Sequence, residues 1–240
     1  MRFAILSDIH ANLEALEAVL ADARTVGCTE FVCLGDVVGY NASPRECIRA
    51  LQDLGGPVVK GNHDEQAGAE HPAQEFTAQA LAAILWTRDL LTPEEKNWLE
   101  TRELTRQVDG FTMVHATLDA PQHWEYVFND FDAAASLKLQ RTPVCFFGHT
   151  HVPLAYVKGD GVHRIALDRL TVRPERKYLI NVGSVGQPRD GDSRAAYCTY
   201  DSDAGVVELR RVEYDFAATQ AKIRAAGLPE GLAWRLALGK

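Results

Sequence analysis

The stretch FFGHTHVP, residues 146–153, places two histidines one residue apart directly after a short apolar run. Side chains of an extended chain alternate between its two sides, so His149 and His151 are expected to face the same way. On its own, GHTH is compatible with a metal site and equally with an ordinary turn. The choice between them depends on what the rest of the chain brings to the same place.

The composition indicates one folded domain with a sizeable core, since 46% of the 240 residues are hydrophobic and 24% are charged. A net charge of −8 disfavours a surface that follows nucleic-acid phosphates, so no stable nucleic-acid complex is expected. A phosphate-containing substrate stays compatible, because metal ions can supply positive charge locally.

Several features favour a cytoplasmic protein. Asp8 and His10 interrupt the N-terminal apolar run before it reaches the length of a signal peptide. No apolar stretch approaches the ~20 residues of a membrane-spanning helix, so no membrane partner is expected. The five cysteines form no CxxC pair and are expected to be reduced thiols.

The first third of the chain alternates strands and helices. Apolar segments predict strands, and helical spacing with Gly or Pro at the ends predicts helices. This order predicts right-handed crossovers and a parallel sheet that is buried on both faces. The expected strands are 3–7, 30–35 and 57–61, and the expected helices are 11–27 and 44–54.

After residue 64 the regular alternation of strands and helices ends. Residues 65–101 are helix-rich and are expected to form a helical insertion, and further helices are expected at 130–140 and 214–226. The short, closely spaced strands of the second half favour an antiparallel second layer. We therefore expect one domain, residues 1–240, of α/β class with two sheet layers flanked by helices. The strands expected in this half are 104–108, 111–115, 143–147, 152–157, 162–167, 178–182, 195–201 and 206–212.

Polar side chains with metal-binding chemistry follow five of the predicted strands. Each group lies just past a strand, which is where open α/β sheets place their ligand sites. A single Asp there is more often a helix cap, and a single His is more often a hydrogen-bonded structural residue. Five groups together favour a metal site. They are Asp8 and His10 in LSDIH, Asp36 in LGDVV, Asn62, His63 and Asp64 in KGNHD, His115 in FTMVH, and His149 and His151 in GHTH.

The residue types indicate the kind of metal. Imidazole nitrogens with carboxylate or amide oxygens, and no thiolate, suit Mn, Fe, Zn or Co better than a soft metal, and the histidines disfavour a pure Mg or Ca site. The groups are too many for one ion. Two ions about 3.5–4 Å apart need a bridging ligand, and Asp36 can serve.

In this order the motifs DxH, GD, GNHD, a lone His and GHTH resemble the calcineurin-like metallophosphoesterase superfamily. The segment NVGSVGQPR, residues 181–189, extends the resemblance to its bacterial phosphodiesterase and dinucleoside-tetraphosphatase-like branch. The resemblance implies a four-layer αββα fold, a β-sandwich flanked by helices. Neither residues 65–101 nor the C-terminal tail carry a motif of the family.

The resemblance also implies a role for each ligand. It implies two divalent transition-metal ions, with Mn first and Fe, Zn, Co or Ni as alternatives. A hydroxide between them would attack phosphorus in line, and His63 would be the general acid that protonates the leaving group. By the same resemblance, one ion is bound by Asp8, His10 and His151, the other by Asn62, His115 and His149, and Asp36 bridges them.

One departure from the family bears on substrate. The phosphoprotein phosphatases have an Asp that orients the catalytic His and an Arg that grips phosphate where this chain has Gly39 and Tyr40. The missing Arg argues against a protein phosphatase. Asp64 is a candidate to orient His63 instead. Lys60 and Arg189 are candidate phosphate contacts, although solvated surface charge is the usual role of a single Lys or Arg.

Aromatic residues follow His115. Tyr126 and Trp124 could stack on a nucleobase, or could simply pack their loop, and packing is the preferred interpretation for Trp124. Tyr40 and Asn41 are candidate pocket residues because they come soon after Asp36.

Three hypotheses of function follow. The leading one is a metal-dependent phosphodiesterase or dinucleoside polyphosphate hydrolase, and the second is a small-molecule phosphomonoesterase. The third is a noncatalytic scaffold, as in the branch of the superfamily that serves as a retromer subunit. The chain keeps His63 and the full ligand set, which favours an enzyme over a scaffold.

Overall fold

A computed structural model describes residues 1–69 and 76–240 of the chain. The first of its two sheets has the strand order β2-β1-β10-β11-β8. β1 alternates two buried faces: Phe3 and Ile5 belong to one apolar cluster, Ala4 and Leu6 to another. The strands of this sheet are β1 (Arg2–Leu6), β2 (Glu30–Cys33), β8 (Arg169–Thr171), β10 (Ala195–Asp201) and β11 (Val206–Val212).

The second sheet has the order β3-β4-β5-β9-β6-β7. The expectation that it would be antiparallel is wrong in part, because β5 pairs in parallel with both of its neighbours, β4 and β9. Helix α6 (Asp130–Leu139) lies between β4 and β5 in the chain and supplies the crossover that a parallel pair requires. The strands are β3 (Thr105–Val108), β4 (Phe111–Val114), β5 (Val144–Phe147), β6 (Leu154–Lys158), β7 (Val162–Ile165) and β9 (Lys177–Asn181).

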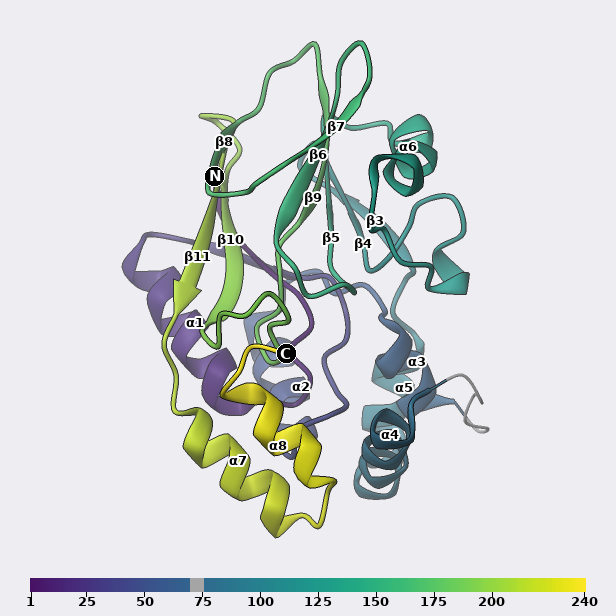
Figure 1. The fold of residues 1–240 in the computed structure, drawn as a ribbon, viewed down its shortest axis with the longest axis vertical. Helices are drawn as coiled ribbons and strands as arrows, with labels where there is room; N and C mark the ends of the chain where they lie inside the picture. The colour runs from purple at the N-terminus through teal and green to yellow at the C-terminus, as the bar shows by residue number, and fades with distance from the viewer. Residues whose placement is uncertain (70–75) are drawn as a thin grey trace.

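The two sheets pack face to face with helices on their outer faces (Figure 1). Helices α1 (Leu13–Thr25) and α2 (Pro44–Leu54) cover the first sheet, and α6 covers the second. The apolar cluster that contains Phe3 and Ile5 fills the space between the sheets. In β5, Val144 and Phe146 join that inner cluster, whereas Cys145 and Phe147 join the α6 side. The expected α/β fold with two sheet layers flanked by helices is therefore confirmed, although both sheets are mixed.

In the described part of the chain, five more helices surround one end of the sandwich. Helices α3 (Asn62–Gly68), α4 (Ala78–Leu90) and α5 (Pro93–Glu100) lie in and beside the segment expected to be a helical insertion. Residues 70–75 of that segment lie outside the described residues, and its treatment as an insertion stays a prediction. Helices α7 (Phe216–Ala225) and α8 (Glu230–Leu236) pack together with α4 around Tyr40.

The sequence-based expectations differ from the structure in a few elements. Residues 57–61 form only single bridges, Cys33 with Val58 and Val59 with Glu103, because the chain turns at once into α3. The first sheet is not wholly parallel, since β1 pairs in parallel with β2 but antiparallel with β10. Strand β8 and helix α8 were not expected. All five cysteines are buried free thiols.

Candidate metal centre

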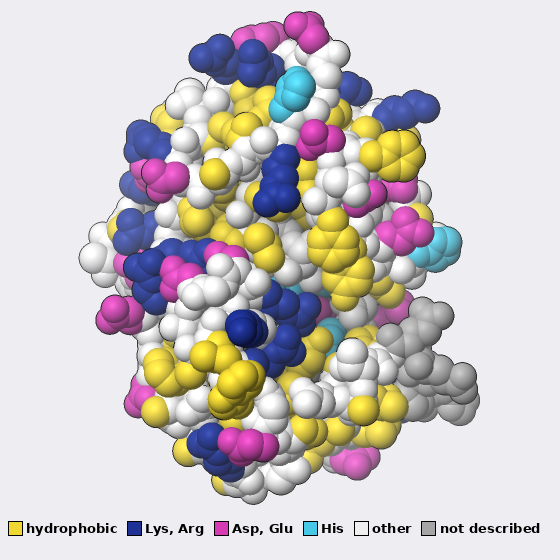
Figure 2. Space-filling model, viewed as in Figure 1, with side chains coloured by type: hydrophobic (Ala, Val, Ile, Leu, Met, Phe, Trp, Pro, Cys, Tyr) yellow, Lys and Arg dark blue, Asp and Glu magenta, His cyan; other side chains and the backbone are white. Residues whose placement is uncertain are grey.

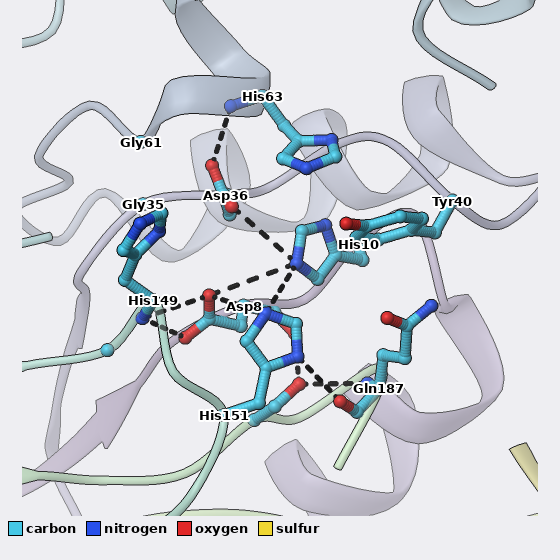
Figure 3. Close-up of polar contacts among 12 residues, drawn as sticks. Asp8, His10, Gly35, Asp36, Tyr40, Gly61, His63, His149, His151 and Gln187 are labelled. Carbon is cyan, nitrogen blue, oxygen red and sulfur yellow. Dashed lines mark hydrogen bonds and ion pairs between the residues drawn. The ribbon is translucent and has the colours of Figure 1, made fainter. Parts of the chain in front are cut away.

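The loops that follow the strands bring the candidate ligands together. Figure 3 shows how close to one another several of them lie: Asp8, His10, Asp36, His63, His149 and His151. Asp8 and His10 follow β1, Asp36 follows β2, and His115 follows β4. The GHTH segment follows β5, and Asn62 with His63 begins α3. The aspartates and histidines of these motifs are all almost completely buried, which is unusual for side chains that carry charge.

Among the residues that the structure describes, three histidine–carboxylate groups converge closely enough to hold cations. In the first, Oδ1 of Asp8 lies 3.2 Å from Nε2 of His151 and 3.8 Å from Nε2 of His10. In the second, Nε2 of His115 lies 3.4 Å from Oδ2 of Asp36 and 3.1 Å from Nδ1 of His149. The third consists of His10, Asp36 and His63.

Asp36 lies between the first two groups. Its Oδ2 is 3.6 Å from Nε2 of His10 and 3.4 Å from Nε2 of His115. Its other oxygen, Oδ1, accepts the backbone N–H of His63 at 2.9 Å. One carboxylate oxygen is thus held by the backbone, and the other faces histidines of both groups.

Backbone carbonyls orient the rings. Nδ1 of His10 faces the Val38 carbonyl oxygen at 3.0 Å, and Nδ1 of His115 faces that of Leu34 at 2.9 Å. Nδ1 of His151 faces the carbonyl oxygen of Gln187 at 2.6 Å. Each of these nitrogens is placed to donate its hydrogen, which leaves the Nε2 lone pair directed at the cluster, as in histidines that bind metals.

His10 and His151 show why the cluster fits cations. Their Nε2 atoms face each other at 3.2 Å while both Nδ1 atoms face carbonyl oxygens. A neutral imidazole has only one N–H hydrogen, and in both rings Nδ1 is placed to donate it. The lone pairs of the two Nε2 atoms therefore point at each other. Burial lowers the pKa of both rings, which disfavours an added proton. A divalent cation between the nitrogens satisfies both of them.

Asn62 adds a second observation that fits. Its side-chain Oδ1 is buried and has no hydrogen-bond partner among the described residues. A buried, unpaired oxygen is costly unless something binds it. Asn62 also lines the cavity beside the cluster. An amide oxygen in this position suits a hard or borderline cation.

The electrostatics of the centre favour positive charge. Burial opposes ionisation of Asp8 and Asp36, but nearby histidines outweigh it and hold both pKa values below their usual range. Burial likewise opposes protonation of His115, yet Asp36 and Asp8 raise its pKa to about 9. Two buried carboxylates thus draw a proton onto a histidine in the absence of any other cation.

The backbone around the centre is strained. Five of the candidate ligands have left-handed backbone angles, with φ between 49° and 66°, which non-glycine residues rarely adopt: Asp8, His10, Asp36, His149 and His151. Gly148 makes the close approach of two loops possible, because a Cβ there would lie 1.9 Å from Oγ of Ser7. Strain of this kind persists only where the surroundings fix the conformation, as they do at functional sites.

The Asp64 carboxylate lies elsewhere than the sequence led us to expect. Asp64 does not orient His63: its carboxylate accepts backbone N–H groups of Val37, Val38 and Gly61. It therefore supports the loop that carries Asp36. The ring of His63 instead packs against aromatic rings, with centroids 4.5 Å from Tyr40 and 5.0 Å from Phe76. Burial lowers the pKa of His63 to about 4.

A cavity of about 240 Å³ opens beside the cluster. Tyr126 lies over the ring of His149, with ring centroids 4.1 Å apart and planes 21° from parallel. Trp124 anchors this loop, since its indole N–H donates to Glu65 at 3.0 Å and its carbonyl oxygen faces Nε2 of His149 at 2.8 Å. The lining residues are Tyr40, Asn62, His63, Gln66, Phe76, Thr77, Ala80, His123, Trp124, Tyr126 and His149.

Of the other residues predicted to contact substrate, Arg189 lies at the metal centre and Asn41 and Lys60 do not line the cavity. Arg189 reaches the centre, where it donates to the hydroxyl of Tyr40 at 3.2 Å. Asn41 is completely buried and donates to the carbonyl oxygen of His10 at 2.8 Å, so its amide supports the ligand loop. Lys60 is not among the residues that line the cavity. Sequence reasoning did not single out Phe76 or Arg235, which also lie near the centre and carry no motif.

The fold and the centre define a class of protein: a two-sheet α/β sandwich whose strand-end loops assemble a buried histidine–aspartate cluster suited to divalent metal ions. The family model of the calcineurin-like phosphoesterase superfamily domain matches residues 1–205. The chain belongs to this superfamily.

The chain is also similar to individual proteins. The uncharacterized protein MJ0912 of Methanocaldococcus jannaschii is 38% identical over 99% of this chain and 98% of its own length. The crystal structure of a metallophosphoesterase from Sphaerobacter thermophilus shares 41% identity and a TM-score of 0.89, and covers 100% of this chain and 99% of that one. Phosphodiesterase YfcE of Escherichia coli is 25% identical over 85% of this chain and 89% of its own.

Among the residues that the structure describes, no helix has both the length and the apolar character needed to cross a bilayer.

Proposed function

We propose that this chain is a dinuclear metal-dependent phosphoesterase that hydrolyses phosphodiesters or dinucleoside polyphosphates. The observation that carries the proposal is the contact between Nε2 of His10 and Nε2 of His151, two lone pairs 3.2 Å apart beside the Asp8 carboxylate. Asp8, His10 and His151 would hold one ion, and His115, His149 and Asn62 the other. Asp36 would contact both ions, because its Oδ2 faces histidines of both groups.

Divalent ions held in this way lower the pKa of coordinated water and neutralise charge on phosphate oxygens. The chain's own residues would do the rest. The backbone N–H of His63 fixes the rotation of the Asp36 carboxylate. The carbonyl oxygens of Val38, Leu34 and Gln187 fix the histidine rings, so the ligands are oriented before any substrate arrives.

His63 would act as the general acid. Its Nδ1 is buried without a partner against Gly39, which leaves Nε2 as the nitrogen that can reach a ligand in the cavity. A phosphate anion bound beside it would favour the imidazolium form, from which Nε2 would pass its proton to the leaving oxygen of the ester and leave a neutral imidazole. The packing of its ring between Tyr40 and Phe76 limits its rotation, a role that a carboxylate has in the phosphoprotein phosphatases that the sequence resembles.

The similarity to YfcE, named as a phosphodiesterase, and the absence of the phosphatase Asp and Arg at Gly39 and Tyr40 favour a diester or polyphosphate substrate. The aromatic lining of the cavity adds support, since a nucleobase can stack on an exposed ring such as that of Tyr126.

The test compares three substrates on protein stripped of metal and reloaded with manganese: a simple phosphodiester, a phosphomonoester and a dinucleoside tetraphosphate. His63→Ala serves as the inactive variant, and His163→Ala, an exposed histidine on β7, serves as its control. Turnover of the diester or tetraphosphate that is lost only in His63→Ala supports the proposal. Preference for the monoester contradicts it in favour of a phosphatase, and no turnover with both metals bound indicates a noncatalytic scaffold.

A further inference from the structure

Two arginines that are far apart in the sequence, Arg189 and Arg235, both lie next to the ring of Tyr40. Arg189 lies in the loop between β9 and β10, and Arg235 lies in α8 near the C-terminus. Their guanidinium carbons are 5.6 Å and 5.9 Å from the centre of the Tyr40 ring. Figure 2 shows Lys and Arg side chains gathered around a hollow in which histidine is visible. Positive charge is thus concentrated here in a chain with a net charge of −8.

Neither arginine forms an ion pair with an Asp or Glu side chain in the described part of the chain. Arg189 donates to the Tyr40 hydroxyl and to Oε1 of Gln187, and its Nε is buried without a partner. Nε of Arg235 donates to the Lys240 oxygen at 2.5 Å. Arginines nearby are paired, Arg194 with Asp192 and Arg211 with Asp190.

Two guanidinium groups placed together with no Asp or Glu side chain between them repel each other, and a bound anion would relieve that repulsion. Burial and the charge of Arg189 both lower the pKa of Arg235, which reflects this cost. Guanidinium groups are suited to phosphate, because their planar forks can donate two parallel hydrogen bonds to its oxygens.

The pair is held in place by packing. Leu232 and Leu236 of α8 are buried in one apolar cluster with Tyr40 and with Ala80 of α4. The segment after α8 is also tied to the loop that carries Arg189, since the backbone N–H of Gly191 donates to the Gly239 carbonyl oxygen at 3.0 Å.

The position of the pair relative to the metal centre is fixed by Tyr40. The Tyr40 ring centroid lies 4.6 Å from that of His10 and 4.5 Å from that of His63. Figure 3 shows its hydroxyl end directed toward His10, and Arg189 donates to that hydroxyl. An anion bound by both arginines would therefore lie next to the centre.

We propose that Arg189 and Arg235 together bind a second phosphoryl group of the substrate, next to the one that reacts at the metal centre. This inference rests on the proposed function and specifies its substrate as a phosphate ester that carries a phosphoanhydride chain, such as a nucleoside or dinucleoside polyphosphate. It assigns the C-terminal helix α8, which lies beyond the matched family model, to substrate binding.

The first test uses the manganese-loaded full chain with Arg235→Gln and Arg189→Gln. Arg49→Gln, an exposed arginine on α2, is the matched control. Loss of one charge-assisted contact predicts that the ratio of kcat/KM for a dinucleoside tetraphosphate to kcat/KM for a simple diester falls about 10- to 100-fold in either variant. The inhibition constant of pyrophosphate should rise by a similar factor, and that of inorganic phosphate should rise less. Values equal to those of Arg49→Gln overturn the inference and leave the proposed function intact.

A second test needs no variant at the site. Pyrophosphate should slow the modification of Arg189 and Arg235 by phenylglyoxal in the wild-type protein, as read by mass spectrometry, without slowing that of Arg49. Equal modification with and without pyrophosphate overturns the inference even if Arg235→Gln fails to fold. If the wild-type protein hydrolyses none of the substrates, the proposed function fails, and protection of the two arginines still decides whether the anion site exists.

Discussion

Gly39 leaves the space that the imidazole ring of His63 occupies: a Cβ on Gly39 would lie 2.3 Å from Nδ1 of that ring. The position that carries the orienting Asp in the phosphoprotein phosphatases thus cannot hold a side chain here while His63 keeps its place. The two arrangements are mutually exclusive. In this chain the imidazole ring of His63 packs against the backbone of Gly39, which has no side chain.

Gly39→Ala should therefore displace His63 and lower kcat by at least about 10-fold, toward the 10²–10⁴-fold scale of a lost general acid. Metal content should stay at two ions per chain, measured by inductively coupled plasma mass spectrometry. The control is Gly27→Ala, because Gly27 has a similar φ of +81° against +92° at Gly39 but no neighbour within 4 Å. Equal kcat in the two variants would contradict the steric argument.

Asp36→Asn should lose metal and activity together. Its Oδ2 faces His10 and His115, so removing the charge weakens both proposed ion sites. The loss should exceed the 10- to 100-fold typical for removal of an outer-shell partner of a metal ligand. Metal content and kcat/KM are measured beside Asp89→Asn, an exposed aspartate on α4. Full occupancy of both sites in Asp36→Asn would refute its proposed bridging position.

His63→Ala should keep both metals and lose about 10²–10⁴-fold in turnover, the usual range for a general acid. The reason is that His63 lines the cavity through Nε2 while the proposed ligand sets are complete without it. His163→Ala is the control. A metal content of one ion per chain in His63→Ala would make His63 a ligand, as its presence in the group with His10 and Asp36 allows.

Much of the fold could be predicted because its elements carry strong local patterns. β5 is a four-residue apolar run with Gly148 after it, and α2 begins at Pro44 and ends before Gly55. Strand β8 could not be predicted, because it is three residues long, mostly exposed, and defined only by pairing with β11. Strand order is likewise a property of long-range pairing: nothing local in β1 indicates that β10 will lie beside it.

The candidate ligands could be predicted for a similar reason, since each stands in a short motif just after a strand. Their supports could not, because the carbonyl oxygens of Val38, Leu34 and Gln187 are backbone atoms that any residue would supply. Asp64 looked like a partner for His63 because it is adjacent in sequence, yet the helix turns its carboxylate back toward the loop N–H groups.

Asp22→Asn should destabilise the protein away from the metal centre. Arg210 donates to both oxygens of Asp22, and the hydroxyl of Tyr197 donates at 2.7 Å. These hydrogen bonds, that of Arg210 foremost, lower the pKa of Asp22, so its stabilisation is complete above the unfolded pKa of about 3.9. It is lost as the pH falls through the lower pKa of the folded state.

At pH 7 the free energy of unfolding of Asp22→Asn should be lower by about 1 kcal/mol, since the group is only partly buried. Urea unfolding at pH 7 and below pH 4 measures it, and the difference from wild type should shrink at the lower pH. Asp53→Asn, an exposed aspartate on α2, is the control. A difference that grows as the pH falls would contradict the sign of the argument.

Tyr126→Ala tests whether a nucleobase stacks in the cavity. The Tyr126 ring already stacks on His149 and, with centroids 5.2 Å apart, on Phe128, so its orientation is fixed while 46% of its surface stays exposed. Stacking worth about 1–3 kcal/mol per base predicts that KM for a dinucleoside tetraphosphate rises about 5- to 150-fold. KM for inorganic tripolyphosphate, which has no base, should not rise. Phe131→Ala, an exposed aromatic residue of α6, is the control. An unchanged KM for the dinucleotide would leave Tyr126 as a packing residue over His149, the role that the contacts of Trp124 already indicate for its neighbour.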